Sequence, residues 1–192
     1  MGFLLSISRM IDGTTRFIGY HVRWLILAAV IVSAVNAIIR KVFDSSSNAW
    51  LELQWLLFGA VFMLAAAYVL QVNAHVRIDV LSNRFSKRTR DIIDAICHVV
   101  MLAPLATVMV WLSFPFFWDS FRSGEVSNNA GGLPVWPAKF LILAGFMLLL
   151  LQMISELVKR LAVLSGRIAD PEPAAVHGHA PGDAAAKAGG NE

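Results

Sequence analysis

The sequence predicts an all-α membrane protein: four transmembrane helices with both termini in the cytoplasm, plus a short amphipathic interfacial helix between the second and third spans. Composition is the first reason. Of 192 residues, 57% are hydrophobic and 15% are charged, whereas an ordinary soluble domain has about 25% charged residues. The second reason is a set of four uncharged runs, each close to the ~17–25 residues that cross a bilayer. A soluble fold could not bury runs of this length.

The four runs set the positions of the spans. They cover residues 24–39, 53–74, 95–118 and 140–155. Flanking basic side chains can extend their charges to the membrane interface. We therefore expect spans at about 22–41, 50–74, 93–118 and 137–158. Pro104 and Pro115 should kink the third span.

The orientation follows from the basic residues. Twelve lie in the N-terminal segment, the second connection and the C-terminal segment, and four lie in the first and third connections. Because basic residues stay on the cytoplasmic side, residues 1–16 are expected to form a cytoplasmic leader before a membrane domain at 17–163. The tail, 164–192, is rich in Ala, Gly and Pro, a composition typical of disordered segments.

The second connection contains the expected interfacial helix, at about 77–90. Its apolar residues are spaced as on one helical face: Ile78, Leu81, Phe85 and Ile92. Arg84 and Arg88 flank this stripe and would turn toward anionic headgroups. The alternative is a solvated connector whose charges only set the topology.

Two acidic residues lie at the ends of spans. Glu52 begins the second span, close to the end of the first span at Arg40 and Lys41. An interfacial ion pair is the simpler expectation, and contact with a partner subunit is the alternative. Glu156 has basic residues three and four positions later, a spacing that favours pairing within one helix.

The sequence contains no recognisable catalytic motif. Its one cysteine, Cys97, excludes an internal disulfide. No span has a central acid or base for a proton relay, and we expect no enzyme activity, cofactor, metal site or nucleic-acid binding. His21, His75 and His98 fall near the inner ends of three spans. They leave open one alternative, a haem-bearing membrane anchor of a redox complex.

A chain without chemistry of its own is most simply a companion of another membrane subunit. An aromatic face on the second span could dock that subunit or contact lipid: Trp50, Trp55, Phe58 and Phe62. The third connection has turn-forming residues at 128–134, followed by Trp136 and Pro137. Tryptophan favours the headgroup level, and proline is tolerated in a first helical turn.

Four short segments carry a resemblance to a known family: Glu52–Phe58, His75–Leu81, Asn129–Lys139 and Gln152–Glu156. In this order and on a four-span plan, they resemble the small membrane subunit of tripartite ATP-independent periplasmic (TRAP) transporters, the DctQ-like family. The resemblance covers roughly residues 15–163. The leader and the tail lie outside it.

The resemblance implies a role and partners. Such transporters combine a periplasmic solute-binding protein, a large DctM-like membrane transport subunit and a small subunit. The large subunit would hold the sodium and substrate sites, and the small one would brace it and help present a periplasmic surface to the binding protein. The implied process is sodium-driven uptake of organic acids across the bacterial inner membrane, with membrane lipids as the remaining partner.

The resemblance also implies structural roles for individual residues. Glu52 and Trp55 would lie at the periplasmic half of the subunit interface, where the face continues with Phe58 and Phe62. The interfacial helix would begin with His75, Arg77 and Asp79. The periplasmic loop would be shaped by Gly131, Gly132, Trp136 and Pro137, with Lys139 following.

Overall fold

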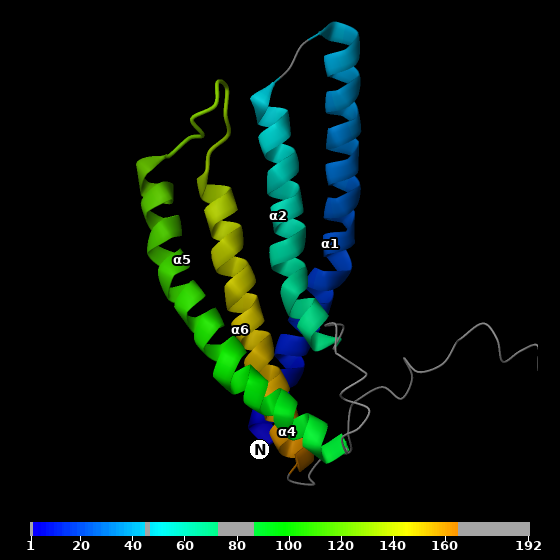
Figure 1. The fold of residues 1–192 in the computed structure, drawn as a ribbon, viewed down its shortest axis with the longest axis vertical. Helices are drawn as coiled ribbons and strands as arrows, with labels where there is room; N and C mark the ends of the chain where they lie inside the picture. The colour runs from blue at the N-terminus through cyan, green and yellow to red at the C-terminus, as the bar shows by residue number, and fades with distance from the viewer. Residues whose placement is uncertain (1, 45–46, 73–86, 165–192) are drawn as a thin grey trace, which may run out of the picture.

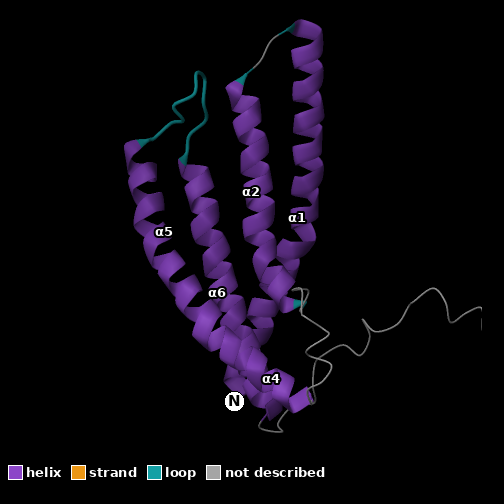
Figure 2. Ribbon diagram, viewed as in Figure 1, coloured by secondary structure: helices purple, strands orange, loops and turns teal. Residues whose placement is uncertain are grey.

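The computed structural model describes residues 2–44, 47–72 and 87–164, and this part of the chain is almost entirely helical (Figures 1 and 2). The elements are α1 (Gly2–Phe43), α2 (Asn48–Gln71), α4 (Lys87–Cys97), the π-helical segment η1 (His98–Leu102), α5 (Ala103–Ser123) and α6 (Trp136–Leu164). Four helices are long and apolar enough to cross a membrane. The expected all-α, four-span class is therefore confirmed.

Several helices extend beyond the spans expected within them, α1 most of all. Helix α1 has 42 residues, about 63 Å at 1.5 Å per residue, whereas the hydrocarbon core of a bilayer is about 30 Å thick. The expected leader thus continues the first span as one helix. Helix α4 likewise runs through η1 into α5. The π-helical segment ends two residues before Pro104, and a proline removes a backbone donor and disturbs the hydrogen-bond ladder of the preceding turn.

The helices form an open layer in the order α5, α6, α2, α1 (Figure 1). Helix α2 packs on α1 and α6, α5 packs on α6, and α1 also contacts α6. We call the end that carries the α1–α2 and α5–α6 connections the loop end, and the opposite end, where α1 begins, the N-terminal end. This arrangement leaves one side of several helices without a neighbour among the described residues.

Small and polar residues form the contact lines between helices. On α1 the buried residues recur every seven positions: Ser8, Thr15, Val22, Ala29 and Asn36. On α5 they are Ala106, Ser113 and Ser120. A seven-residue period keeps a contact line facing the neighbouring helix as two helices supercoil. Small side chains along that line let transmembrane backbones approach closely.

Helices α2 and α6 approach each other closely at Gly145. A Cβ added there would lie 2.7 Å from the Met63 Cβ and 2.9 Å from the Met63 carbonyl oxygen. Since a backbone oxygen cannot rotate aside as a side chain can, this position requires glycine.

We expect Gly145→Ala to lower the melting temperature of the detergent-solubilised protein, because overpacking costs about 1–3 kcal/mol. The matched control is Gly59→Ala on α2, where an added Cβ meets nothing within 4 Å. That variant should be neutral or stabilising, since alanine is the better helix former. Equal shifts for the two variants would contradict the packing argument.

The expected interfacial helix falls largely outside the described residues. Positions 73–86 lie outside the described residues, and with them His75, Arg77, Asp79, Leu81, Arg84 and Phe85. Arg88 lies in the first turn of α4. The interfacial helix and the cytoplasmic placement of both termini stay predictions, and the tail at 165–192 is likewise outside the described part.

Candidate functional site

The connection between α5 and α6 is a short hairpin, 124–135. The Ser127 amide donates to the Leu133 carbonyl at 3.0 Å, and the Val135 amide donates to the Glu125 carbonyl, also at 3.0 Å. A single antiparallel bridge joins Val126 and Pro134. The loop end therefore carries a defined shape at the site of the expected turn residues.

Glu52 fixes this hairpin to α2. Its carboxylate accepts hydrogen bonds from the Ser127 hydroxyl, from the Asn129 amide group at 2.7 Å and from the Leu133 backbone N–H at 2.7 Å. Hydrogen bonds to a charged acceptor are shorter and stronger than neutral ones. One side chain near the start of α2 thus positions three residues that lie 75 to 81 positions later.

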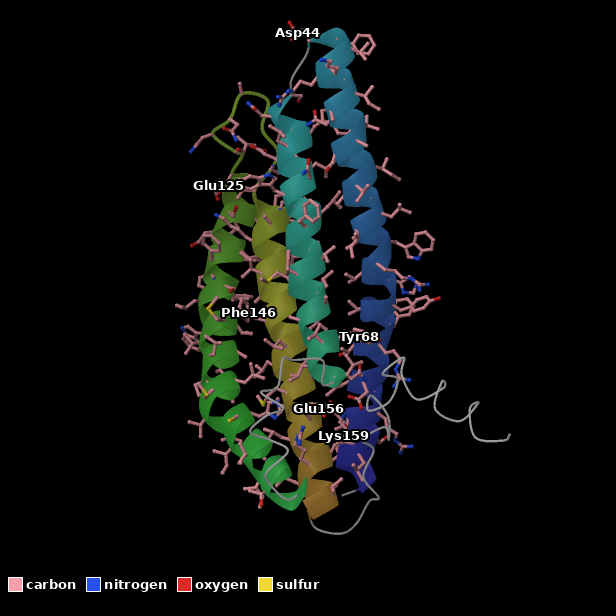
Figure 3. All side chains as sticks on the ribbon, turned by 45° about the vertical axis from the view of Figure 1, so that its right-hand side comes forward. Asp44, Tyr68, Glu125, Phe146, Glu156 and Lys159 are labelled. Carbon is pink, nitrogen blue, oxygen red and sulfur yellow. The ribbon has the colours of Figure 1, made fainter. Side chains whose placement is uncertain are left out.

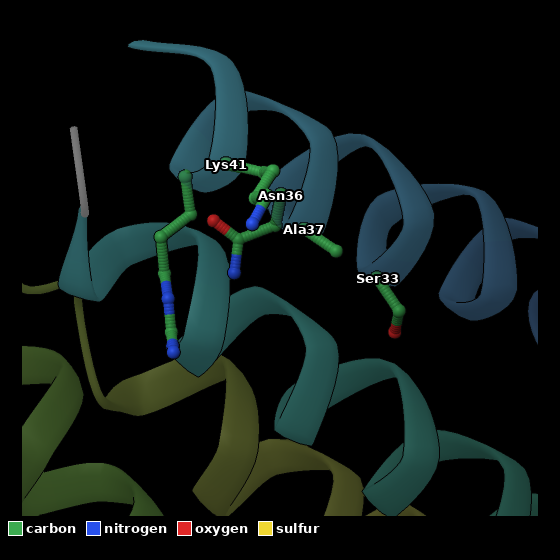
Figure 4. Close-up of a pocket in the computed structure, with 5 residues that line it drawn as sticks. Ser33, Asn36, Ala37 and Lys41 are labelled. Atoms are coloured by element: carbon green, nitrogen blue, oxygen red, sulfur yellow. The ribbon is translucent and has the colours of Figure 1, made fainter. Parts of the chain in front are cut away.

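The expected ion pair of Glu52 with Arg40 or Lys41 is not what the structure contains. Within the described residues, both Glu52 oxygens are bound by the hairpin, and no salt bridge joins them to either cation. Arg40 and Lys41 instead line a pocket of about 440 Å³ on α1 itself, with Ser33, Asn36 and Ala37 (Figure 4). The hairpin offers donors at the Glu52 carboxylate, which explains the difference.

Gly131 and Gly132 of the hairpin each require the absence of a side chain, for different reasons. Gly131 has a φ of +69°, in the left-handed region that favours glycine. At Gly132 an added Cβ would lie 2.5 Å from the Ser127 Cβ. A side chain at Gly132 would push Ser127 away from Glu52. Both glycines therefore support the geometry that Glu52 recognises.

The base of the hairpin is held by Lys139 and aromatic rings. The Lys139 ammonium forms a salt bridge with Glu125 and lies 4.2 Å from the centre of the Phe116 ring. Glu125 stands at this end of α5 (Figure 3). The hydrogen bond from Lys139 is the main cause that lowers the pKa of the Glu125 carboxyl below its ordinary value.

Trp136 and Pro137 start α6 as expected. Trp136 packs edge-on against Phe121, with ring centres 5.5 Å apart, so it closes the α5–α6 contact at the loop end. Such edge-to-face geometry is favourable for aromatic pairs.

The aromatic face expected on α2 is not covered by other described residues of the chain. Trp55 is 77% exposed and Phe62 is 73% exposed, and Phe58 is also exposed. Trp55 also lines a groove of about 720 Å³ under the hairpin between α2 and α6, together with Glu52, Gly59 and Met63. One end of the aromatic face therefore lies beside the hairpin.

A second polar cluster lies at the N-terminal end, centred on Asp12. The Asp12 carboxylate accepts hydrogen bonds from the Ser155 hydroxyl at 2.8 Å, the Gln152 amide at 2.9 Å and the Lys159 ammonium at 3.0 Å. The Gln71 amide donates to the Asp12 carbonyl at 3.0 Å. This cluster joins α1, α2 and α6.

Glu156 belongs to the same cluster. Lys159 pairs with it within α6, which confirms the local pairing expected from the spacing, and the Gln152 amide donates to it at 3.0 Å. Figure 3 shows Glu156 and Lys159 near the N-terminal end of the molecule. Because Lys159 also binds Asp12, one cation serves two buried or partly buried acids.

Sequence reasoning missed Asp12 and its partners. Asp12 and Ser8 fell in the expected leader, and Gln152 was noted only as part of a segment that resembles the family. A signal was available, because Gln152 and Ser155 are polar residues within an otherwise apolar run. Such residues usually face other helices. Their partner on α1, more than 140 positions away, could not be read from spacing.

The sequence was compared with known protein families, curated proteins and solved structures. The family described as "Tripartite ATP-independent periplasmic transporters, DctQ component" matches residues 12–163. The chain belongs to the DctQ family. The match begins at Asp12 and ends one residue before the last position of α6, so it covers both polar contact sites. No curated protein and no solved structure matches the chain.

Membership of the DctQ family indicates the general role of the chain. The DctQ family comprises small components of TRAP transporters and is not a family of enzymes, and such transporters generally work with a large membrane component and a solute-binding protein. With four apolar helices, this DctQ protein is a multi-pass membrane protein. The alternative of a haem-bearing redox anchor gains no support from the family.

We expect Glu52→Ala to release the hairpin. Losing the carboxylate leaves three donors without their acceptor, so amide exchange across 125–135 should accelerate by roughly tenfold or more. Hydrogen–deuterium exchange with mass spectrometry measures this. Asp119→Asn is the control, because it also removes an acid at the loop end but leaves the Glu52 contacts intact. Equal exchange in wild type and Glu52→Ala would refute the anchoring role.

The Glu125–Lys139 contact should open on acidification. Since its pKa is lower in the folded state, Glu125 stabilises the hairpin fully at neutral pH, above the ordinary carboxyl value of about 4.3, and this contribution is lost as the pH falls through the lowered folded value. A spin label at Asn128, in a Cys97→Ala background, should gain mobility as the pH falls through the lowered pKa of Glu125. In Glu125→Gln the label should be more mobile at neutral pH and change less on acidification. Identical titrations would contradict the assignment, because Glu52 titrates in both proteins.

Proposed function

We propose that this DctQ protein is the scaffold subunit of a sodium-driven TRAP transporter for organic acids in the bacterial inner membrane. It braces a large DctM-like transport subunit and helps dock a periplasmic solute-binding protein. The observation that carries the proposal is the aromatic face of α2, Trp55 to Phe62, exposed beside a hairpin that Glu52 holds in place.

The aromatic face supports the bracing role. Trp55 and Phe62 are seven residues apart, the period that keeps side chains on one line of contact with a neighbouring helix. The groove beside them, under the hairpin, is open at Gly59, where an added Cβ would meet nothing within 4 Å. Ridges of large side chains beside an open depression suit the packing of a partner helix.

The hairpin supports the docking role. On the predicted topology the loop end faces the periplasm, and 124–135 is then the largest segment exposed there. A surface that a solute-binding protein must recognise repeatedly benefits from a fixed shape, since ordering a loose loop on binding costs affinity. The bonds from Glu52 and Lys139 supply that order in advance.

The substrate class and the sodium coupling rest on the family resemblance rather than on a residue of this chain. On this proposal the transported organic acid and the sodium ions bind the large subunit. The small subunit contributes a rigid support against which the large one moves.

The test is co-expression of this chain with its large subunit, followed by co-purification through a tag on this chain and uptake assays in liposomes that include the binding protein. A Trp55→Ala/Phe62→Ala double variant should lower recovery of the large subunit by about tenfold, because aromatic anchors dominate interface energies. Sodium-driven uptake of organic acid should fall in parallel.

The matched control is Trp111→Ala on α5. Trp111 is 78% exposed, as exposed as Trp55, but it lies on another helix and should face lipid. Unchanged recovery in the double variant, or an equal loss in the control, would show that the α2 face is not the interface. Uptake by this chain without the large subunit would overturn the scaffold role itself.

A further inference from the structure

The first half of α1 carries two parallel rows on its exposed side. One row is apolar and recurs every seven residues, with exposures between 59% and 77%: Phe3, Met10, Phe17 and Trp24. The second row consists of Arg9, Arg16 and Arg23, all exposed, each directly before a member of the first. The contact line toward α2 and α6, which includes Ser8 and Thr15, is buried. The two rows therefore belong to a surface that the rest of the described chain leaves open.

This surface carries positive charge that the described protein does not neutralise. From Gly2 to Trp24 the sequence has one acid, Asp12, and its carboxylate is already bound by α6. Arg23 lies 3.5 Å over the Tyr20 ring. Arg9 and Arg16 form no salt bridge with any other described residue, so two guanidinium groups stand available for an anion.

Gly13 separates these two arginines. It follows Arg9 by four positions and precedes Arg16 by three, so both side chains reach the same stretch of helix surface. An added Cβ at Gly13 would meet nothing within 4 Å. The bare backbone leaves room for a tetrahedral anion between two guanidinium groups, whose planar forks match phosphate oxygens.

We propose that this face binds an anionic phospholipid, with its phosphate between Arg9 and Arg16 over Gly13 and its acyl chains along Met10 and Phe17. The positive charge of the arginine row indicates that the ligand is an anion. The apolar row beside it indicates that this anion carries hydrocarbon chains. Basic residues beside aromatic side chains are typical of the cytoplasmic end of a transmembrane helix, where anionic headgroups lie. Phe3, Met10 and Phe17 would otherwise form an uncovered apolar stripe.

The experiment uses the full chain purified in a neutral detergent, with native mass spectrometry to follow bound lipid during titration with phosphatidylglycerol or phosphatidylcholine. Wild type should retain phosphatidylglycerol in preference. In an Arg9→Gln/Arg16→Gln double variant that preference should fall by about tenfold, since each basic residue near an anionic surface strengthens the binding of anionic lipid. The matched control, Arg40→Gln/Lys41→Gln, removes two charges from the other end of the same helix and should leave the preference intact.

A second variant guards against misfolding. Gly13→Glu places a carboxylate between Arg9 and Arg16, where it pairs with them, while it replaces glycine by a better helix former. It should abolish the preference without lowering the melting temperature. An excess of inorganic phosphate should not displace the lipid, because it lacks the acyl chains.

Three outcomes would overturn the proposal. The first is an unchanged lipid preference in both Arg9→Gln/Arg16→Gln and Gly13→Glu. The second is an equal loss in the Arg40→Gln/Lys41→Gln control. The third is full displacement by inorganic phosphate, which would indicate a site for free anions. If the double variant kept its lipid but lost the large subunit on co-purification, the face would be a protein contact.

Discussion

Helices in a lipid bilayer gain little by hiding apolar side chains from one another, because the lipid tails are equally apolar. Association then depends on how closely the backbones approach and on the few polar contacts between them. In this chain small residues line the contacts, from Ser8 to Asn36 on α1 and from Ala106 to Ser120 on α5. Gly145 brings α6 against the backbone of Met63. The open layer of helices rests on these close approaches.

Polar contacts then fix the register at both ends of the layer. At the N-terminal end, Asp12 gathers donors from α6 and α2. At the loop end, Glu52 gathers donors from the hairpin. A charged group is costly in an apolar setting unless its hydrogen-bonding capacity is filled. The carboxylates of Asp12 and Glu52 therefore favour one arrangement of the neighbouring helices and hairpin. Apolar packing alone would allow several such arrangements.

The same layer leaves surfaces that a closed bundle would have hidden. Helix α2 presents Trp55 and Phe62, and α1 presents its arginine and aromatic rows. These surfaces differ in chemistry. The α2 face is apolar and lies beside an ordered hairpin, which suits a protein partner, whereas the α1 face combines cations with hydrocarbon, which suits lipid. On the two proposals made above, one face supports the partner subunit and the other attaches the chain to the membrane.

The sequence by itself determined the number of spans, the helical class and the family resemblance, because runs of apolar residues and short motifs are local properties of the chain. It also indicated the turn at 128–134, the start of α6 at Trp136 and the pairing of Glu156 with Lys159, all of which depend on neighbours in sequence. It did not reveal that Glu52 binds the hairpin rather than Arg40 or Lys41, nor that Asp12 has partners on α6. Those pairings join residues 75 to 147 positions apart, and only the packing of the helices decides which polar groups meet.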